Sequence, residues 1–458
     1  MKLQFLGAAG TVTGSKFYLR DDNHKVLIDA GMFQGPRALR ERNWEPLPLN
    51  PEELDSVLLT HAHIDHTGYL PRLGRDGLRA KVHCTWGTRD LAKILLPDAA
   101  RLQEEEANFR NRKKKTRFKP ALPLFSIVDA EQVISRLVGH RYRESFQPVE
   151  GWKATFQDAG HILGSAWIDL KVPGKRLIFS GDLGRAGAPI IKDPQPPTGS
   201  CDVLLLESTY GDRNHATNDK LEDLAEIVVE VVKRKGTLVI PAFAVERTQE
   251  ILYLLEELIR RDDIPKLPVF IDSPMAVRAT RLFREHHEYY DAETNALISQ
   301  GERVLGYRNL MLCESVQESK SIRTTPAPKI VISASGMATG GRILHHLRNY
   351  LPDPKNHILM VGYQSVGTRG WVILNGADRV KIFGEEVPVR AQVSRLEGFS
   401  GHADHREVLQ WCRGFEAPPK VTYLVHGEED ALRAQGESLR ALGWNVKIPS
   451  HLEEVSLD

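Results

Sequence analysis

Three histidines and an aspartate crowd into one short segment of the chain, residues 61–66, which reads His-Ala-His-Ile-Asp-His. Packing gives no reason for so many adjacent ionisable groups, whereas imidazole nitrogens and carboxylate oxygens are common ligands of zinc and related ions. The apolar, β-branched run at 56–60 predicts a buried strand immediately before them. The sequence therefore predicts a metal-binding loop at the carboxyl end of a strand, where open sheets usually place their chemistry.

Length and composition set the protein class. At 458 residues the chain is long enough for two or three domains, and 41% hydrophobic with 26% charged residues is ordinary for a soluble globular protein. The four cysteines form no C-x-x-C pair, which indicates a reducing compartment and no cysteine-built metal site. No run approaches the ~20 apolar residues that span a bilayer. We therefore expect a cytoplasmic protein with no membrane partner.

The charge is balanced overall but uneven locally. A net charge of +1 gives no global electrostatic reason to bind nucleic acid. Residues 110–119, however, form a dense basic tract, Arg-Asn-Arg-Lys-Lys-Lys-Thr-Arg-Phe-Lys. This tract is either a solvated surface loop or a local site for a polyanion.

Ligand-type residues recur beside other predicted strand ends and glycines. These residues are Asp29 after strand 25–28, His161 between glycines, Asp182 after strand 176–180, Glu207 after strand 202–206, His402 before a short helix, and His426 after strand 421–425. Asp29 either caps a tight turn or holds the metal loop from outside. The recurrence favours one shared site over unrelated packing roles.

The middle of the chain alternates strands with helices. We expect strands at 237–240, 268–272 and 329–333, and helices near 246–261 and 341–350, which together indicate a parallel α/β domain. Earlier in the chain, residues 64–75 and 87–109 are predicted to be helical. No phosphate loop or dinucleotide fingerprint follows a strand, which disfavours nucleotide-cofactor functions. The segment 335–342 is either a phosphate-holding loop or only a glycine-rich turn.

In order along the chain, Asp29, the 61–66 cluster, His161 and Asp182 resemble the four ligand-bearing motifs of the metallo-β-lactamase superfamily. Glu207, His402 and His426 resemble motifs A, B and C of its β-CASP branch, the nucleases of RNA and DNA processing. The sequence looks nearest to bacterial and archaeal relatives of the endonuclease subunit of the cleavage and polyadenylation specificity factor, and more distantly resembles RNase J. We expect no counterpart of the long C-terminal extension of RNase J.

The resemblance implies the fold and its domain order. It implies an α/β protein with a four-layer αβ/βα metallo-β-lactamase domain, built from residues 1–209 and 396–458. A β-CASP α/β domain would be inserted at 210–395. The active site would lie in the cleft between the two domains.

The resemblance also implies roles for individual residues. One Zn²⁺ would be held by His61, His63 and His161, and a second by Asp65, His66 and His426, with Asp182 bridging and Mn²⁺ as an alternative metal. A hydroxide activated by the two ions would attack the phosphodiester. His402 would be the general acid, and Glu207 would orient it. Asp65 would be a catalytic residue as well as a metal ligand. Asp29 would support the cluster from outside it.

Substrate and partners are implied less directly. In the family, histidine at motif C accompanies RNA-processing members, so His426 favours single-stranded RNA as the partner. Phosphate contacts are expected by position alone at Arg247, Ser335, Arg342 and Thr368. A homodimer is expected because members of the family often form dimers.

The alternative functions are a DNA nuclease of the same branch, a hydrolase of small thioesters or lactams, and a non-catalytic scaffold.

Overall fold

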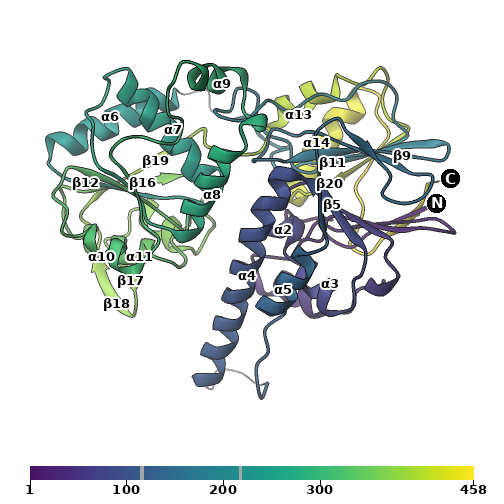
Figure 1. The fold of residues 1–458 in the computed structure, drawn as a ribbon, viewed down its shortest axis with the longest axis horizontal. Helices are drawn as coiled ribbons and strands as arrows, with labels where there is room; N and C mark the ends of the chain where they lie inside the picture. Colours follow the sequence, from purple (N-terminus) through teal and green to yellow (C-terminus); the bar gives the residue numbers. More distant parts are fainter. Residues whose placement is uncertain (114–117, 216–218, 458) are drawn as a thin grey trace. The chain divides into compact units, whose positions relative to one another are not determined.

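The computed structural model describes residues 1–113, 118–215 and 219–457, and the chain divides into two compact units (Figure 1). The first unit comprises Met1–Ala188, Lys192–Asn214 and His402–Asp458. The second unit comprises Pro189–Ile191 and His215–Gly401. The first unit is thus made from both ends of the sequence, and the second is inserted into it.

Two seven-stranded sheets form the centre of the first unit. In spatial order, the first sheet contains β22 (Glu454–Ser456), β1 (Lys2–Phe5), β2 (Phe17–Arg20), β3 (Lys25–Ile28), β4 (Ser56–Leu58), β5 (Lys81–Thr85) and β6 (Leu137–His140). The second sheet contains β21 (Val446–Lys447), β20 (Val421–Val425), β11 (Val203–Glu207), β10 (Lys175–Phe179), β9 (Ala166–Val172), β8 (Lys153–Asp158) and β7 (Ser145–Phe146).

Helices cover the outer face of each sheet. The helical segments of this unit are α1 (Arg37–Glu41), η1 (Arg42–Trp44), η2 (Pro51–Glu53), α2 (Ile64–Thr67), α3 (Leu70–Arg75), α4 (Trp86–Arg112), α5 (Ile127–Ile134), α13 (His405–Cys412) and α14 (Glu429–Ala441). Side chains of α3, α4 and α5 share a buried cluster with the first sheet, and those of α13 and α14 share one with the second.

A third apolar cluster joins the two sheets face to face. Within β11, Val203 and Leu205 belong to this inner cluster, whereas Leu204 and Leu206 belong to the cluster under α13 and α14. Successive residues of a strand point to opposite faces, so a strand buried on both faces is apolar over most of its length, as the first four residues of β11 are. The layers therefore run helix, sheet, sheet, helix, and the predicted four-layer fold is confirmed.

The predicted helix at 64–75 is wrong in one respect, because the chain forms two short helices there. Helix α2 ends at Thr67, Gly68 follows it, and α3 begins at Leu70 with Pro71 in its first turn. Proline has no N–H to donate and fits best in the first turn of a helix, so Pro71 favours a new helix start there; α4, by contrast, accommodates Pro97 in its interior. The predicted helix at 87–109 is confirmed as the longer α4. Of the basic tract, residues 114–117 lie outside the described residues.

The second unit contains a six-stranded parallel sheet. Its order is β14 (Leu310–Leu312), β13 (Val269–Ile271), β15 (Lys329–Ser333), β12 (Thr237–Pro241), β16 (His357–Val361) and β19 (Gln392–Leu396), beside a hairpin of β17 (Arg379–Ile382) and β18 (Glu385–Pro388). The helical segments are α6 (Lys220–Lys233), α7 (Arg247–Arg260), α8 (Pro274–Glu285), η3 (His287–Tyr289), α9 (Ala292–Ser299), α10 (Val316–Ser321), α11 (Ile343–Tyr350) and α12 (Arg369–Leu374). The predicted α/β insertion is confirmed. Among the described helices, none has the length and apolar character needed to cross a membrane.

Candidate metal centre

Neighbouring parallel strands of the first unit bring the ligand-type residues together. Strands β10, β11 and β20 lie side by side and point the same way. Asp182 follows β10, Glu207 is the last residue of β11, and His426 comes directly after β20. In the other sheet, β3 and β4 are also parallel, and they lead to Asp29 and to the segment 61–66. The carboxyl ends of strands from both sheets therefore contribute to one site.

Three imidazoles converge on one side of the Asp182 carboxylate. His63 Nδ1 lies 3.1 Å from both His61 Nε2 and His161 Nε2. Asp182 Oδ2 lies 3.4 Å from His61 Nε2 and 3.6 Å from His161 Nε2. Three ring nitrogens and one carboxylate oxygen directed at a common point form a donor set that suits zinc.

A second group of donors lies on the other side of the same carboxylate. His66 Nε2 is 3.3 Å from His426 Nε2, and Asp65 Oδ2 is 3.5 Å from His426 Nε2. Asp182 Oδ1 lies 3.2 Å from His66 Nε2 and 3.4 Å from His426 Nδ1. The two oxygens of Asp182 thus face two different donor groups.

The protonation of these residues is compatible with cation binding. Asp182 Oδ1 is buried and has no hydrogen-bond partner among the described residues. Burial raises the pKa of Asp182, but the charges of His426 and His66 outweigh burial and hold that pKa well below its ordinary value. Burial lowers the pKa of His63 to about 4 and holds the pKa of His61 well below 6.5. An ionised carboxylate and neutral imidazoles are the forms in which these groups bind metal. Burial lowers the pKa of His66 too, but the charges of Asp182 and Asp29 outweigh burial and hold it well above 6.5, so His66 would release its proton on binding an ion. The donor set as a whole fits the metal that the resemblance implies.

Glu207 and His402 form a third group next to Asp182. His402 Nδ1 lies 3.4 Å from Glu207 Oε1 and 3.9 Å from Asp182 Oδ2. Burial lowers the pKa of His402, but the charges of Glu207 and Asp182 outweigh burial and raise that pKa to about 9. Glu207 is held in turn by the Leu183 N–H, which donates to Oε1 over 2.6 Å, and by the Thr209 hydroxyl, which donates to Oε2 over 2.5 Å. The arrangement keeps a protonated imidazole beside the donor groups.

Asp29 contacts the site through His66 and Thr60. Asp29 Oδ2 is 2.7 Å from His66 Nδ1, which leaves His66 Nε2 directed at the second donor group. The Thr60 hydroxyl donates to Asp29 Oδ2 over 2.8 Å, and the Thr60 N–H donates to Asp29 Oδ1 over 2.8 Å. Carboxylates that fix the ring of a metal-binding histidine in this way are common around metal sites.

The sequence analysis did not find three hydroxyl residues that contact the site. They are Thr60, Ser15, whose Oγ lies 3.2 Å from His66 Nε2, and Thr209, whose Oγ1 lies 3.2 Å from His426 Nδ1. Thr60 directly precedes His61, Ser15 directly follows Gly14, and Thr209 lies two residues after Glu207; this closeness in sequence is the only signal that the sequence offers.

The expected phosphate-contact residues all belong to the second unit. Arg342 is used internally, since its Nη1 lies 2.7 Å from Asp272 Oδ1 and donates to the Cys313 carbonyl over 3.1 Å. Arg247 is buried and ion-paired with Glu250. The other two hold local structure: the Ser335 hydroxyl accepts from the Thr339 N–H, and Thr368 caps α12. Their contact with substrate stays a prediction.

Comparison with known proteins gives matches along most of the chain. Residues 24–239 match the beta-lactamase superfamily domain, 248–373 the Beta-Casp domain, and 386–449 the Zn-dependent metallo-hydrolase RNA specificity domain. A solved protein of unknown function from Enterococcus faecalis has the same fold, with a TM-score of 0.57 and 13% identity over 99% of each chain.

Curated relatives extend over nearly the whole sequence. Ribonuclease TTHA0252 of Thermus thermophilus is 39% identical over 98% of each chain. Transcription termination factor FttA of Methanocaldococcus jannaschii is 30% identical over 99% of this chain and 71% of its own length. An RNase J-like protein from the same organism is 28% identical over 98% of this chain and 97% of its own. With the domain order and the geometry above, these matches place the chain in the β-CASP family of metallo-β-lactamase ribonucleases.

Proposed function

We propose that this protein hydrolyses phosphodiester bonds of single-stranded RNA at a site for two metal ions. The observation that supports this proposal most directly is the position of the Asp182 carboxylate, whose two oxygens face two separate groups of donors. His61, His63 and His161 would hold one ion and Asp65, His66 and His426 the other, with Asp182 between them. When bound, such ions supply positive charge against the anionic phosphodiester and lower the pKa of water to near ~7.

The protein's own residues would then orient the metal ligands and control proton transfer. Burial raises the pKa of Asp65, but the hydrogen bond from His426 outweighs burial and lowers that pKa to about 2, so Asp65 remains an anionic ligand. Asp29 and Thr60 fix the ring of His66. These contacts support an arrangement that is set before substrate arrives.

His402 is the proposed general acid. Its Nδ1 faces Glu207 Oε1 and its pKa is raised to about 9, after burial alone has lowered it, by the charges of Glu207 and Asp182. A protonated imidazole would donate a proton to the leaving sugar oxygen, and Glu207 would orient the ring and favour its charged form. Glu207 is therefore proposed to act through His402.

The comparisons favour RNA over DNA as the substrate. The C-terminal match is named for RNA specificity, and the relative that is 39% identical is named a ribonuclease. The decisive experiment is digestion of a single-stranded RNA oligomer, labelled at the 5′ or the 3′ end, with and without chelator. A matched DNA oligomer is the control. Chelator-sensitive cleavage of RNA with little cleavage of DNA is expected, and preferential cleavage of DNA would contradict the proposal.

The role of Asp182 has its own test. Asp182→Asn keeps the shape of the side chain but removes the charge that faces both donor groups. We expect the variant to lose at least one metal ion per chain by elemental analysis, together with its RNA cleavage. Retention of two ions per chain would contradict the bridging role.

A further inference from the structure

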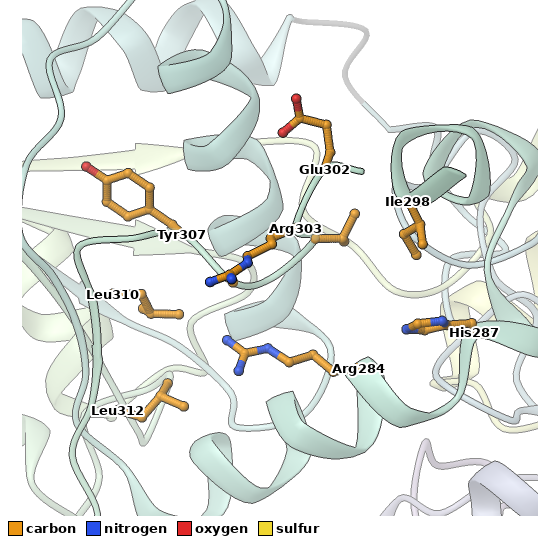
Figure 2. Close-up of a pocket in the computed structure, with 10 residues that line it drawn as sticks. Arg284, His287, Ile298, Glu302, Arg303, Tyr307, Leu310 and Leu312 are labelled. Atoms are coloured by element: carbon orange, nitrogen blue, oxygen red, sulfur yellow. The ribbon is translucent and has the colours of Figure 1, made fainter. Parts of the chain in front are cut away.

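The second unit contains a cavity that has no part in the proposed chemistry. Its volume is about 390 Å³, within the range of roughly 300–1,000 Å³ in which small-molecule sites fall. It is formed by the end of α8, the start of η3, helix α9 and the segment that leads into β14. Figure 2 shows the side chains that line it.

Two guanidinium groups point into this cavity. Figure 2 shows those of Arg284 and Arg303 directed toward the same space, with the Glu302 side chain directed away from them. Among the described residues, Arg303 forms no ion pair or hydrogen bond through its side chain. Arg284 donates only to the Leu305 carbonyl, over 2.7 Å from Nε. The buried carboxylate of Glu256 lies near Arg284, but no carboxylate among the described residues pairs with Arg303, so an anion between the two guanidinium groups would be attracted by both.

The rim of the cavity is fixed by buried contacts. The Leu305 carbonyl accepts from Arg284, and the Leu305 N–H donates to Glu256 Oε2 over 2.7 Å. The Tyr307 N–H donates to Glu256 Oε1 over 2.8 Å. Because Glu256 is buried and both of its oxygens are used in this way, the segment 305–307 is held on both sides. The cavity is therefore a formed site rather than a gap in a loose loop.

The remaining walls are apolar and aromatic. Ile298 lies on one side, Leu310 and Leu312 lie on the other, and Tyr307 contributes its ring (Figure 2). Apolar walls do not stabilise a bare inorganic anion, whereas the flat base of a nucleoside packs on them. The lining thus combines a place for a phosphate with a place for a base.

We propose that this cavity binds a nucleoside phosphate, with the phosphate between Arg284 and Arg303 and the base against the apolar wall. Two sources share that chemistry: one nucleotide of an RNA chain, which rests on the proposed function, and a free mononucleotide, which does not. Arg303 is the residue to change, because it is exposed and supports no other part of the fold.

The test uses the metal-loaded full-length protein. Calorimetric titration with adenosine 5′-monophosphate, adenosine and inorganic phosphate is carried out on wild type, Arg303→Gln, Arg303→Glu and the control Arg323→Gln. Arg323 is an exposed arginine of the same unit that does not line the cavity. We expect affinity for the monophosphate to fall roughly 10-fold in Arg303→Gln and further in Arg303→Glu, with no change in the control. Adenosine and inorganic phosphate should each bind more weakly than the monophosphate.

Cleavage kinetics of a 20-nucleotide RNA show whether the cavity holds a nucleotide of the RNA chain or a free mononucleotide. If RNA is the occupant, Arg303→Gln raises KM for the 20-mer, leaves kcat unchanged and leaves KM for a trinucleotide unchanged. If a free nucleotide is the occupant, only the titration responds. Unchanged monophosphate affinity together with unchanged KM would overturn the proposal, as would equal binding of inorganic phosphate. A wild type that binds the monophosphate but cleaves no RNA would refute the proposed function and not the pocket.

Discussion

At the scale of residues, one carboxylate surrounded by histidines accounts for most of the site's electrostatics. Histidine ring nitrogens lie within 4 Å of the Asp182 oxygens from five positions: His61, His66, His161, His402 and His426. The pKa values of His66 and His402 are raised and those of His61 and His63 are lowered, because His66 and His402 each contact a second carboxylate. Asp29 supplies one to His66 and Glu207 supplies one to His402, whereas His61 and His63 are governed by burial. The second carboxylate thus favours the protonated form of His66 and of His402, and His66 would lose its proton when it binds an ion.

His402→Ala should separate catalysis from metal binding. We expect metal content near that of wild type and a fall in turnover of roughly 10²–10⁴-fold, the usual contribution of a general acid. Elemental analysis and cleavage of labelled RNA measure the two effects. His405→Ala is the matched control, because His405 contacts Gln435 and belongs to none of the donor groups. Equal loss of metal and activity would make His402 a ligand instead.

Thr60→Val should weaken metal binding without touching a ligand. The hydroxyl that donates to Asp29 also lies 3.1 Å from His61 Nδ1, and valine keeps its shape while removing it. Loss of such a supporting contact typically lowers metal affinity about 10–100-fold, which a competition titration with a chromophoric chelator measures. Thr422→Val is the control, because the Thr422 hydroxyl is buried and unpartnered among the described residues. If both variants bind metal like wild type, Thr60 only fills space.

At the scale of elements, backbone contacts lock the metal-binding loop to the first sheet. The Ser15 N–H donates to the Asp65 carbonyl over 2.8 Å, and the Gly31 N–H donates to the Ser15 carbonyl over 2.9 Å. A Cβ built on Gly31 would lie 1.6 Å from the Asp65 carbonyl oxygen. The end of β3, the start of β2 and helix α2 therefore approach one another backbone to backbone.

Gly31→Ala should accordingly destabilise the first unit. Overpacking usually costs about 1–3 kcal/mol, and a clash with backbone cannot be relieved by a rotamer change, so we expect a loss at or above the upper end of that range. Thermal unfolding measures the loss. Gly340→Ala is the control, because nothing lies within 4 Å of the added atom. An unfolding midpoint like that of wild type would show that the loop can move aside.

How far these elements could be predicted depends on the kind of signal each one leaves. Buried strands such as 421–425 are rich in β-branched and aromatic residues and were predicted correctly, whereas the break between α2 and α3 depends on how Gly68 and Pro71 act together. Histidines at strand ends are conspicuous, so the donor residues could be proposed from sequence. Thr60 could not, because a threonine beside a strand is ordinary and only the fold places it against Asp29.

At the scale of the whole molecule, the donor groups join parts of the chain that are far apart in sequence. His426, at the carboxyl end of the chain, meets His66, and the second unit is inserted between them. The insertion was predicted from the resemblance to the β-CASP branch, which the motifs and their order carry. The cavity beside Arg284 and Arg303 could not be predicted, since its walls come from separate helices and a loop with no common pattern.

Removal of metal should therefore destabilise the first unit selectively. Bound ions would link the segments that follow β4, β10 and β20, and a ligand present at 1,000 times its Kd stabilises the folded state by about 4 kcal/mol. After treatment with chelator we expect hydrogen exchange to rise at 59–66 and near His426, and the unfolding midpoint of the first unit to fall by several degrees. Exchange in the sheet of the second unit should not change. Readdition of zinc should restore protection in wild type but not in Asp182→Asn, and a uniform rise in exchange over both units would contradict this account.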